Sequence, residues 1–274
     1  MLNESNHSLY LNEWGRSVID PHNHLLPGID DGARSPEISY SMLARLQSLG
    51  FHTIVTTPHV TDAPTAEYAS RVASAFQAIS AEAAGIGIHL ISGYEVMLTP
   101  RTARLLSDGA PLTLGNSHTV LVEVSLAGWP AFADSILFDL QIAGFTPILA
   151  HPERYQSIIA DPSKAIALAD RGVVLQITTS AFTGLFGRDV QRTAEALLLA
   201  DAVGVLGSDA HGDGKRMDML ADGIARVEEL VGPTRTQQLL VDNMDALLND
   251  RALPIPAAME STPRRKRGLL SRIR

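Results

Sequence analysis

Apolar residues are arranged along the chain in short runs that alternate with longer segments of helical periodicity. Seven β-rich runs predict strands at residues 16–20, 53–57, 88–94, 118–122, 147–150, 173–177 and 203–206. Between them, apolar positions recur every three or four residues, as at Ile38, Met42, Leu46 and Leu49 in the segment 36–50. Strands that alternate with amphipathic helices are typical of a parallel sheet covered by helices.

The helical segments carry recognisable start and stop signals. Ser35, Pro36 and Glu37 form a typical helix start, and Gly50 ends the same helix. Further helices are predicted at 65–84, 101–106, 131–143, 163–169, 190–200, 218–230 and 234–249. Seven βα units in one domain predict an α/β fold that closes, or nearly closes, into a TIM-like barrel. An open doubly wound sheet is the alternative, and in both folds functional side chains lie at the carboxyl ends of the strands.

The barrel would occupy residues 16–252, between two segments of different composition. Residues 1–15 are expected to form a loose N-terminal arm. Residues 253–274 combine a Pro-containing flexible linker with a basic tail, RRKRGLLSRIR at 264–274, which has six positive charges and no negative ones. Such a tail is either solvated and disordered or in peripheral contact with an anionic membrane.

No apolar signal-peptide core is present in the first nineteen residues, and no run approaches eighteen apolar residues. We therefore expect a cytoplasmic protein, located at the inner face of the membrane if the tail binds lipid.

The amino-acid composition excludes several kinds of site and partner. The chain has no cysteine, which excludes disulfides, thiolate metal sites and cysteine nucleophiles. Any metal must therefore be held by His, Asp and Glu. Without the basic tail, 16 basic residues stand against 30 acidic ones, a net charge of −14. An acidic body of this kind argues against a nucleic-acid partner.

The stretch DPHNHLLPGIDDGA at residues 20–33 holds the first candidate metal ligands. His22 and His24 alternate at a strand end, so both imidazoles would leave it on the same side. Asp20 is expected to hold one of these rings through its far nitrogen. Asp30 and Asp31 follow in a Gly-containing turn and supply carboxylate oxygens.

Further His, Asp and Glu residues follow later predicted strands. A parallel barrel would bring the ends of these strands to the same rim. A single histidine in such a place is commonly an ordinary hydrogen-bonded residue, but the recurrence favours a metal centre. The strand-end candidates are His22, His24, His59, Glu95, Glu123, His151, Asp209 and His211. With a carboxylate from the turn they exceed the four to six ligands of one ion, so two or three ions are expected. Imidazole and carboxylate without thiolate suit Mn²⁺, Fe or Zn²⁺, and such clusters activate water for phosphoester hydrolysis.

Two arginines fall on the same rim. Arg154 is three residues past His151, and Arg216 is five residues past His211. A single arginine here commonly forms a surface salt bridge. Two at a ligand-bearing rim favour bidentate binding of a phosphate.

With these residues assembled, the chain resembles the PHP (polymerase and histidinol phosphatase) superfamily. Within that superfamily it is most similar to the CpsB/CapC-type metal-dependent protein tyrosine phosphatases of bacterial capsule and exopolysaccharide systems. The resemblance spans about residues 17–250 and rests on DPHNHLLPGIDDGA, TPH at 57–59, GYE at 93–95, HPER at 151–154 and GSDAH at 207–211. The LPGxDDGA extension is much more specific to this subgroup than the HxH doublet.

The resemblance implies a distorted seven-stranded (β/α)7 barrel, the PHP fold, with three divalent metal ions, Mn²⁺ before Fe or Zn²⁺. It implies that a metal-bridging hydroxide attacks phosphorus while Arg154 and Arg216 neutralise the phosphoryl oxygens. The implied ligand sets are His22, His24, Glu95 and Asp209 for one ion; Glu95 as a bridge with Glu123 and His151 for the second; and Asp31, His59 and His211 for the third. The implied substrate is a phosphotyrosine protein, a membrane-associated tyrosine kinase that regulates polysaccharide synthesis.

Other functions share parts of this pattern. A PHP phosphoesterase for a small metabolite such as histidinol phosphate would have the same barrel and metals. A PHP exonuclease fits the acidic body less well. A non-catalytic, metal-stabilised interaction module would bind metal without turnover.

Overall fold

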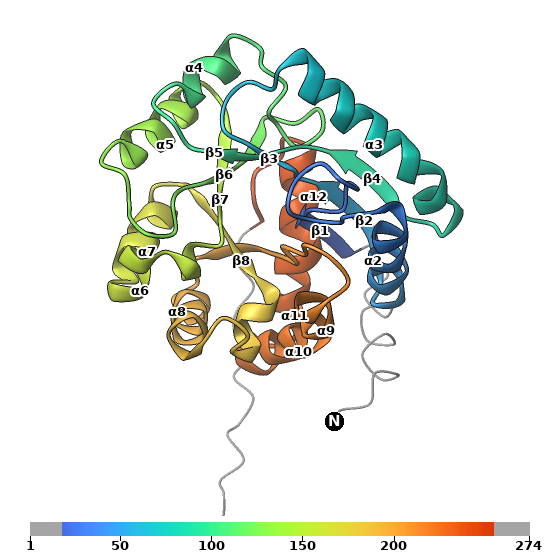
Figure 1. Cartoon of the computed structure of the whole chain (residues 1–274). Coiled ribbons are helices and arrows are strands. Elements are labelled where there is room, and N and C mark those ends of the chain that lie inside the picture. Colours follow the sequence, from blue (N-terminus) through green and yellow to red (C-terminus); the bar gives the residue numbers. More distant parts are fainter. Residues whose placement is uncertain (1–17, 255–274) are drawn as a thin grey trace, which may run out of the picture.

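The structure, a computed structural model, describes residues 18–254, so the predicted N-terminal arm, most of the predicted tail and its membrane contact lie outside the described residues. Nine strands lie in two sheets in which all paired strands run parallel (Figure 1). The first sheet has the order β1 (Val18–Asn23), β2 (Phe51–Thr56) and β4 (His89–Ser92). The second has the order β3 (His59–Val60), β5 (Glu95–Met97), β6 (Thr119–Glu123), β7 (Thr146–Ala150), β8 (Val174–Thr178) and β9 (Val203–Gly207). The prediction of a parallel α/β fold is confirmed.

The described strands number nine rather than the predicted seven because two short strands, β3 and β5, follow closely after the predicted strands 53–57 and 88–94 and lie outside their predicted bounds. Thr57 and Pro58 separate β2 from β3, and Pro58 has no N–H to continue a ladder. Gly93 and Tyr94 separate β4 from β5. A Cβ at Gly93 would lie 2.7 Å from the side chain of Leu114, which would have to shift to admit a larger residue. At each of these two points the chain moves from the three-stranded sheet to the six-stranded one.

The ends of the first and last strands lie side by side. Asn23 in β1 forms an isolated parallel bridge with Ala210, just after β9. The amide of His24 donates to the carbonyl of Ala210 at 3.0 Å, and the amide of Asp209 donates to the carbonyl of His22 at 2.9 Å. Residues almost 190 positions apart in the sequence are thereby held at one rim.

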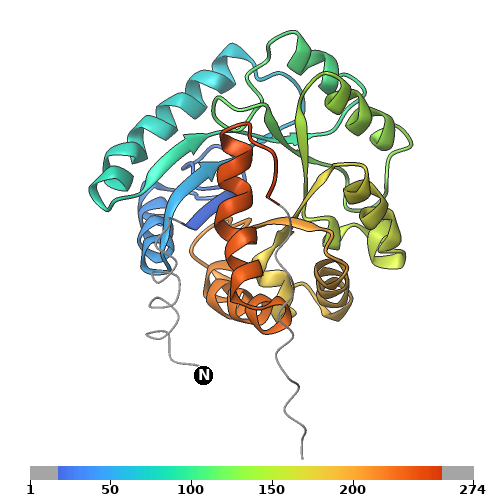
Figure 2. The same ribbon diagram turned by 180° about the vertical axis from the view of Figure 1, so that it is seen from behind.

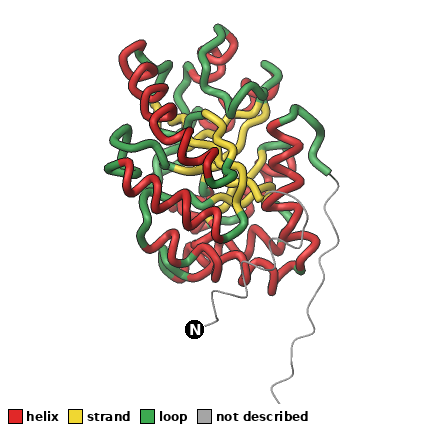
Figure 3. Tube along the Cα trace, turned by 90° about the vertical axis from the view of Figure 1, so that its right-hand side faces the viewer, coloured by secondary structure: helices red, strands yellow, loops and turns green. Residues whose placement is uncertain are grey.

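Helices surround the strands, which lie inside (Figures 1 and 3). The predicted helices correspond to α2 (Pro36–Ser48), α3 (Ala66–Gly85), α4 (Thr102–Ser107), α5 (Ala133–Ile142), α7 (Ser163–Asp170), α8 (Arg188–Leu199) and α10 (Leu220–Val231). The predicted last helix is divided into α11 (Pro233–Gln237), a π-helical turn (Gln238–Asp242) and α12 (Asn243–Leu248). Two short helices, α6 (Gln156–Ala160) and α9 (Lys215–Asp218), and two 3-10 turns, Pro152–Arg154 and Thr179–Thr183, were not predicted.

The C-terminal helix covers the end of the strands opposite the predicted site (Figure 2). The side chain of Asn243 donates to the carbonyl of Gly204 at the start of β9, and Thr119 at the start of β6 donates to the carbonyl of Leu247. Met244 and Leu247 pack into an apolar cluster with inward-facing strand residues. The amino ends of the strands are therefore closed by α12, and the carboxyl ends carry the polar residues.

No helix among residues 18–254 has the length and apolar character needed to cross a membrane.

Candidate metal centre

All nine predicted metal ligands converge at the carboxyl ends of the strands. They form four overlapping groups in which the potential ligand atoms lie within 4.8 Å of one another. His22 lies at the end of β1 with His24 directly after it, Glu123 ends β6, and His151 follows β7. His59 and Glu95 were expected after strands but begin the short strands β3 and β5. The groups are His22, His24 and Asp209; His22, Glu95 and His151; His59, Glu95 and Glu123; and His24, Asp31, His59 and His211.

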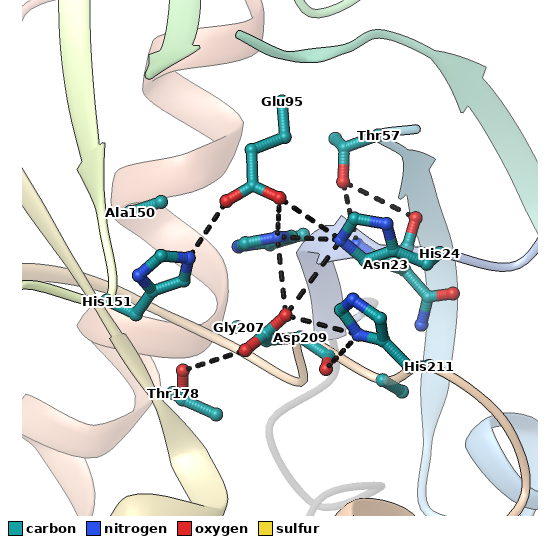
Figure 4. A network of polar contacts seen from close by, with 12 residues as sticks. Asn23, His24, Thr57, Glu95, Ala150, His151, Thr178, Gly207, Asp209 and His211 are labelled. Atoms are coloured by element: carbon teal, nitrogen blue, oxygen red, sulfur yellow. Dashed lines mark hydrogen bonds and ion pairs between the residues drawn. The ribbon is translucent and has the colours of Figure 1, made fainter. Parts of the chain in front are cut away.

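Glu95 is fully buried and its carboxylate points toward the histidines of the cluster (Figure 4). Its Oε2 lies 3.1 Å from Nε2 of His22, 3.2 Å from Nε2 of His24 and 3.2 Å from Nδ1 of His59. Its Oε1 lies 2.9 Å from Nε2 of His151. One carboxylate therefore faces four imidazoles.

The groups agree in part with the ligand sets that the resemblance implies. Asp31, His59 and His211 stand together, with Oδ1 of Asp31 at 3.4 Å from Nε2 of each imidazole. Glu123 lies nearer to His59, with 3.0 Å between Oε1 and Nδ1, than to His151, with 3.9 Å between Oε2 and Nε2. The grouping of Glu123 with His59 rather than with His151 was not visible in the sequence.

The cluster has a buried floor and an open side. The side chains of His22, His24 and Glu95 are inaccessible to solvent, whereas the side chain of Asp31 is 70% exposed and that of His59 is 35% exposed. A substrate would therefore approach from the side of Asp31 and His59.

The rings of the two first histidines are oriented by residues outside the predicted ligand set. Nδ1 of His24 lies 2.8 Å from the carboxylate of Asp30, and Nδ1 of His22 lies 2.8 Å from the side-chain oxygen of Gln176. When these Nδ1 atoms donate, each Nε2 is left free as a ligand. The expectation that Asp20 holds a ring is wrong. Buried Asp20 instead accepts from the amide and hydroxyl of Ser208, at 2.9 and 2.6 Å.

The glycines of the LPGIDDGA segment allow the loop to return to His24. The amide of Ala33 donates to the carbonyl of His24 at 3.0 Å, and the amide of Gly28 donates to the carbonyl of Ala33 at 2.8 Å. Gly28 has a φ of 68°, and a Cβ at Gly32 would lie 2.2 Å from the carbonyl oxygen of His24. The loop therefore brings Asp30 against the His24 ring.

Two candidate ligands have left-handed backbone conformations that non-glycine residues seldom adopt. His151 has a φ of 36° and Asp209 a φ of 48°. Such conformations persist where the surrounding structure fixes them, and they concentrate at functional sites.

Burial and charge perturb the proton affinities of the cluster. Burial alone would lower the pKa of His24, but the neighbouring carboxylates of Asp30 and Glu95 outweigh it and raise this pKa to about 10. Burial would raise the pKa of Asp30, yet the His24 ring holds it at about 2. Burial and the neighbouring charge of His24 lower the pKa of His211 to about 4. Burial is likewise outweighed at Glu95, whose pKa the charge of His22 holds well below its usual range.

The predicted phosphate-binding arginines lie at the edge of the same cluster. Nη1 of Arg154 is 2.8 Å from Oδ2 of Asp209, and Nη1 of Arg216 is 2.9 Å from Oδ1 of the same carboxylate. Their side chains are 18% and 21% exposed. Both guanidiniums are thus held beside the candidate ligands and accessible from solvent.

The donor set fits divalent metal ions. Oε2 of Glu95 is buried without a hydrogen-bond partner, although three imidazole nitrogens surround it. Ligand atoms bound about 2.1 Å from one tetrahedral ion lie about 3.4 Å apart. The distances of 3.1 and 3.5 Å from Nε2 of His22 to Glu95 and to Asp209 are close to that spacing. Imidazole and carboxylate donors suit Mn²⁺, Fe or Zn²⁺.

Comparison with known proteins decides the family. A sequence profile described as capsular polysaccharide synthesis, CpsB/CapC, matches residues 18–249.

The chain belongs to the CpsB/CapC family.

Curated CpsB/CapC proteins resemble the chain over most of their length. Tyrosine-protein phosphatase YwqE of Bacillus subtilis (strain 168) is 27% identical over 238 residues, which are 86% of this chain and 93% of YwqE. Tyrosine-protein phosphatase CpsB of Streptococcus pneumoniae is 26% identical over 243 residues, which are 86% of this chain and 100% of CpsB.

A solved CpsB/CapC structure has the same fold. It comes from crystal structures of YwqE from Bacillus subtilis and CpsB from Streptococcus pneumoniae, described as unique metal-dependent tyrosine phosphatases. It matches with a TM-score of 0.76 and 26% identity, over 90% of this chain and 100% of that one. The family resemblance inferred from the motifs is therefore confirmed.

Proposed function

We propose that this chain hydrolyses phosphotyrosine on proteins as a metal-dependent phosphatase. The observation that carries the proposal is the convergence of nine His, Asp and Glu side chains with two arginines at the carboxyl ends of the strands. The curated CpsB/CapC relatives named as tyrosine-protein phosphatases support the same activity.

The nine side chains would hold three divalent ions, Mn²⁺ before Fe or Zn²⁺. The proposed ligands are His22, His24, Asp31, His59, Glu95, Glu123, His151, Asp209 and His211. When bound, such ions supply a water of lowered pKa and positive charge beside the phosphoryl oxygens. Gln176 and Asp30 would fix the imidazole tautomers that ligation requires.

Arg154 and Arg216 would bind and orient the phosphoryl group. Each guanidinium can donate two parallel hydrogen bonds to phosphate oxygens. Asp209 holds both arginines near the cluster, which reduces the ordering cost of substrate binding. Because a phenolate of pKa about 10 leaves readily, a dedicated proton donor is not required.

The finer architecture that we propose is a distorted seven-stranded barrel. Its support is the continuity of β2 with β3 and of β4 with β5, together with the bridge between Asn23 and Ala210. The proposed substrate is a membrane-associated tyrosine kinase of a polysaccharide system, and the family description supports the link to polysaccharide synthesis. We also propose a cytoplasmic location, at the inner face of the membrane if the basic tail at residues 264–274 contacts lipid.

The test compares phosphate release from a phosphotyrosine peptide, a phosphoserine peptide and histidinol phosphate by protein loaded with Mn²⁺. A His22→Ala variant is the control, because it removes a buried candidate ligand. Turnover of phosphotyrosine that disappears in the variant supports the proposal. A preference for histidinol phosphate would assign the chain to small-molecule chemistry, and metal binding without any turnover would favour an interaction module.

A further inference from the structure

Phe186 is an aromatic residue beside the proposed phosphate-binding arginines that has no role in the function proposed above. The centre of its ring lies 5.0 Å from Cζ of Arg154 and 5.4 Å from Cζ of Arg216. Both distances are within the range of cation–π contacts. The same guanidiniums donate to Asp209, one of the candidate metal ligands.

The turn that carries Phe186 is fixed by the fold. It follows β8 and the 3-10 turn Thr179–Thr183, on the same rim as the candidate ligands. The amide of Gly187 donates to the carbonyl of Gly184 at 2.9 Å, and both glycines have positive φ, 97° and 84°. Phe186 packs on the core but is only partly buried. A portion of the ring is therefore available to a ligand at a defined place.

The position of Phe186 has a consequence for the ester group of a bound phosphate. A phosphate bound by Arg154 and Arg216 would lie on guanidiniums that pack against Phe186, which puts the Phe186 ring within reach of an organic group on that phosphate. In an aryl phosphate a single oxygen separates phosphorus from the aromatic ring, whereas an alkyl phosphate places only a narrow methylene chain there. Aromatic rings in edge-to-face or offset contact gain roughly 2- to 12-fold in affinity beyond the area that they bury.

We propose that Phe186 determines specificity for aryl phosphates by packing against the ring of phosphotyrosine. This inference rests on the proposed function, because it names a residue that selects the substrate class of the same site. It also separates Phe186 from the arginines, which bind the phosphate of aryl and alkyl esters alike.

The test is calorimetric binding of phenylphosphonate and methylphosphonate to the full chain loaded with Mn²⁺. The two probes share the head group and differ in the ring, and neither requires turnover. Wild-type protein is compared with Phe186→Ala, Phe186→Leu and Phe186→Tyr. Phe138→Ala is the matched control, since Phe138 is 60% exposed on α5 and away from the candidate ligands. Thermal denaturation of each variant checks the fold.

We expect wild-type protein to prefer phenylphosphonate and Phe186→Ala to lower that preference roughly 2- to 12-fold. Phe186→Leu should lower it too, and Phe186→Tyr and Phe138→Ala should retain it. Equal weakening of both probes would overturn the proposal, because Phe186 would then act only by holding the arginines. Wild-type protein without a preference for phenylphosphonate would also overturn it. A retained preference without hydrolysis of phosphotyrosine would reject the proposed function instead.

Discussion

The carboxylate of Asp30 lies 2.8 Å from Nδ1 of His24, and this contact connects the LPGIDDGA loop to the floor of the candidate metal centre. The same carboxylate accepts from the amide of His59 at 3.2 Å and from that of Gly32 at 2.9 Å. Asp30 thus fixes the position of one candidate ligand and the ring orientation of another, without being a predicted ligand itself.

Substitution of Asp30 by Ala should therefore weaken metal binding without removing a ligand. Partners that orient a metal-bound histidine typically contribute 10- to 100-fold in metal affinity or activity. We expect Asp30→Ala to raise the Mn²⁺ concentration for half-maximal activity by roughly that factor. Chelator competition provides the direct measurement. Asp62→Ala, which removes a partly exposed carboxylate paired with Arg101, is the control. An unchanged metal affinity in Asp30→Ala would mean that His24 needs no such partner.

The metal-free protein should be most stable near pH 6.5. The raised pKa of His24, about 10, stabilises the folded state below the unfolded value of 6.5, and this stabilisation is lost as the pH rises toward 10. The pKa of His211 is lowered to about 4 and that of Asp30 to about 2. These two groups stabilise the folded state at higher pH instead. The contribution of His211 is lost as the pH falls below 6.5, and that of Asp30 is lost as the pH falls below 3.8.

Thermal denaturation in the presence of a chelator, from pH 4 to 10, checks this profile. The alkaline decline should become smaller in Asp30→Asn, which removes one charge from the His24 pair. Protein saturated with Mn²⁺ should instead become more stable from pH 6 to 8, because ligation requires the neutral imidazole and releases protons. A metal-free protein whose melting temperature rises from pH 7 to 9 would contradict the protonation of the buried cluster.

The sequence predicted the main architecture because each element carries its own apolar pattern. The helix that begins at Pro36 and the strand at Thr146–Ala150 agree with the expectation to within two residues. The change of sheet at Pro58 and Gly93 was not predicted, because it depends on contacts such as that of Gly93 with Leu114. Local periodicity contains no information about which sheet a strand joins.

The candidate ligands could be found in the sequence because the fold places strand ends at one rim. The residues that orient these ligands could not be found in the sequence. Asp30 and Asp31 are adjacent acids, and only the folded loop directs Asp30 to His24 and Asp31 to His59 and His211. Gln176 is 154 residues from His22 in sequence, and nothing in its immediate neighbourhood distinguishes it. The role expected of Asp20 failed because Ser208, directly after β9, donates its amide and its hydroxyl to that carboxylate.

Replacement of either arginine by lysine should impair catalysis and leave metal binding intact. Arg154 and Arg216 can each bind phosphate bidentately, which an ammonium cannot. Loss of one preorganised donor at the transition state typically costs about 10²- to 10³-fold in kcat. We expect Arg154→Lys and Arg216→Lys each to lower kcat/KM for a phosphotyrosine peptide by about that factor. Arg101→Lys is the matched control, because Arg101 is exposed and pairs with Asp62. Activity within a few fold of wild type in both variants would remove these arginines from the site.

Gly32→Ala should damage the site through the backbone alone. A Cβ at Gly32 would lie 2.2 Å from the carbonyl oxygen of His24 and 2.5 Å from its Cβ, which are atoms that cannot move without displacing a candidate ligand. Strain of this kind in a packed region typically costs about 1–3 kcal/mol. We expect a lower melting temperature and weaker Mn²⁺ binding, even though no ligand or charge is removed. Gly128→Ala is the matched control, because a Cβ there meets nothing within 4 Å. If Gly32→Ala lost stability but kept its metal affinity, the loop would support the fold without positioning His24. If the variant lost neither stability nor metal affinity, the loop would not approach His24 as closely as described.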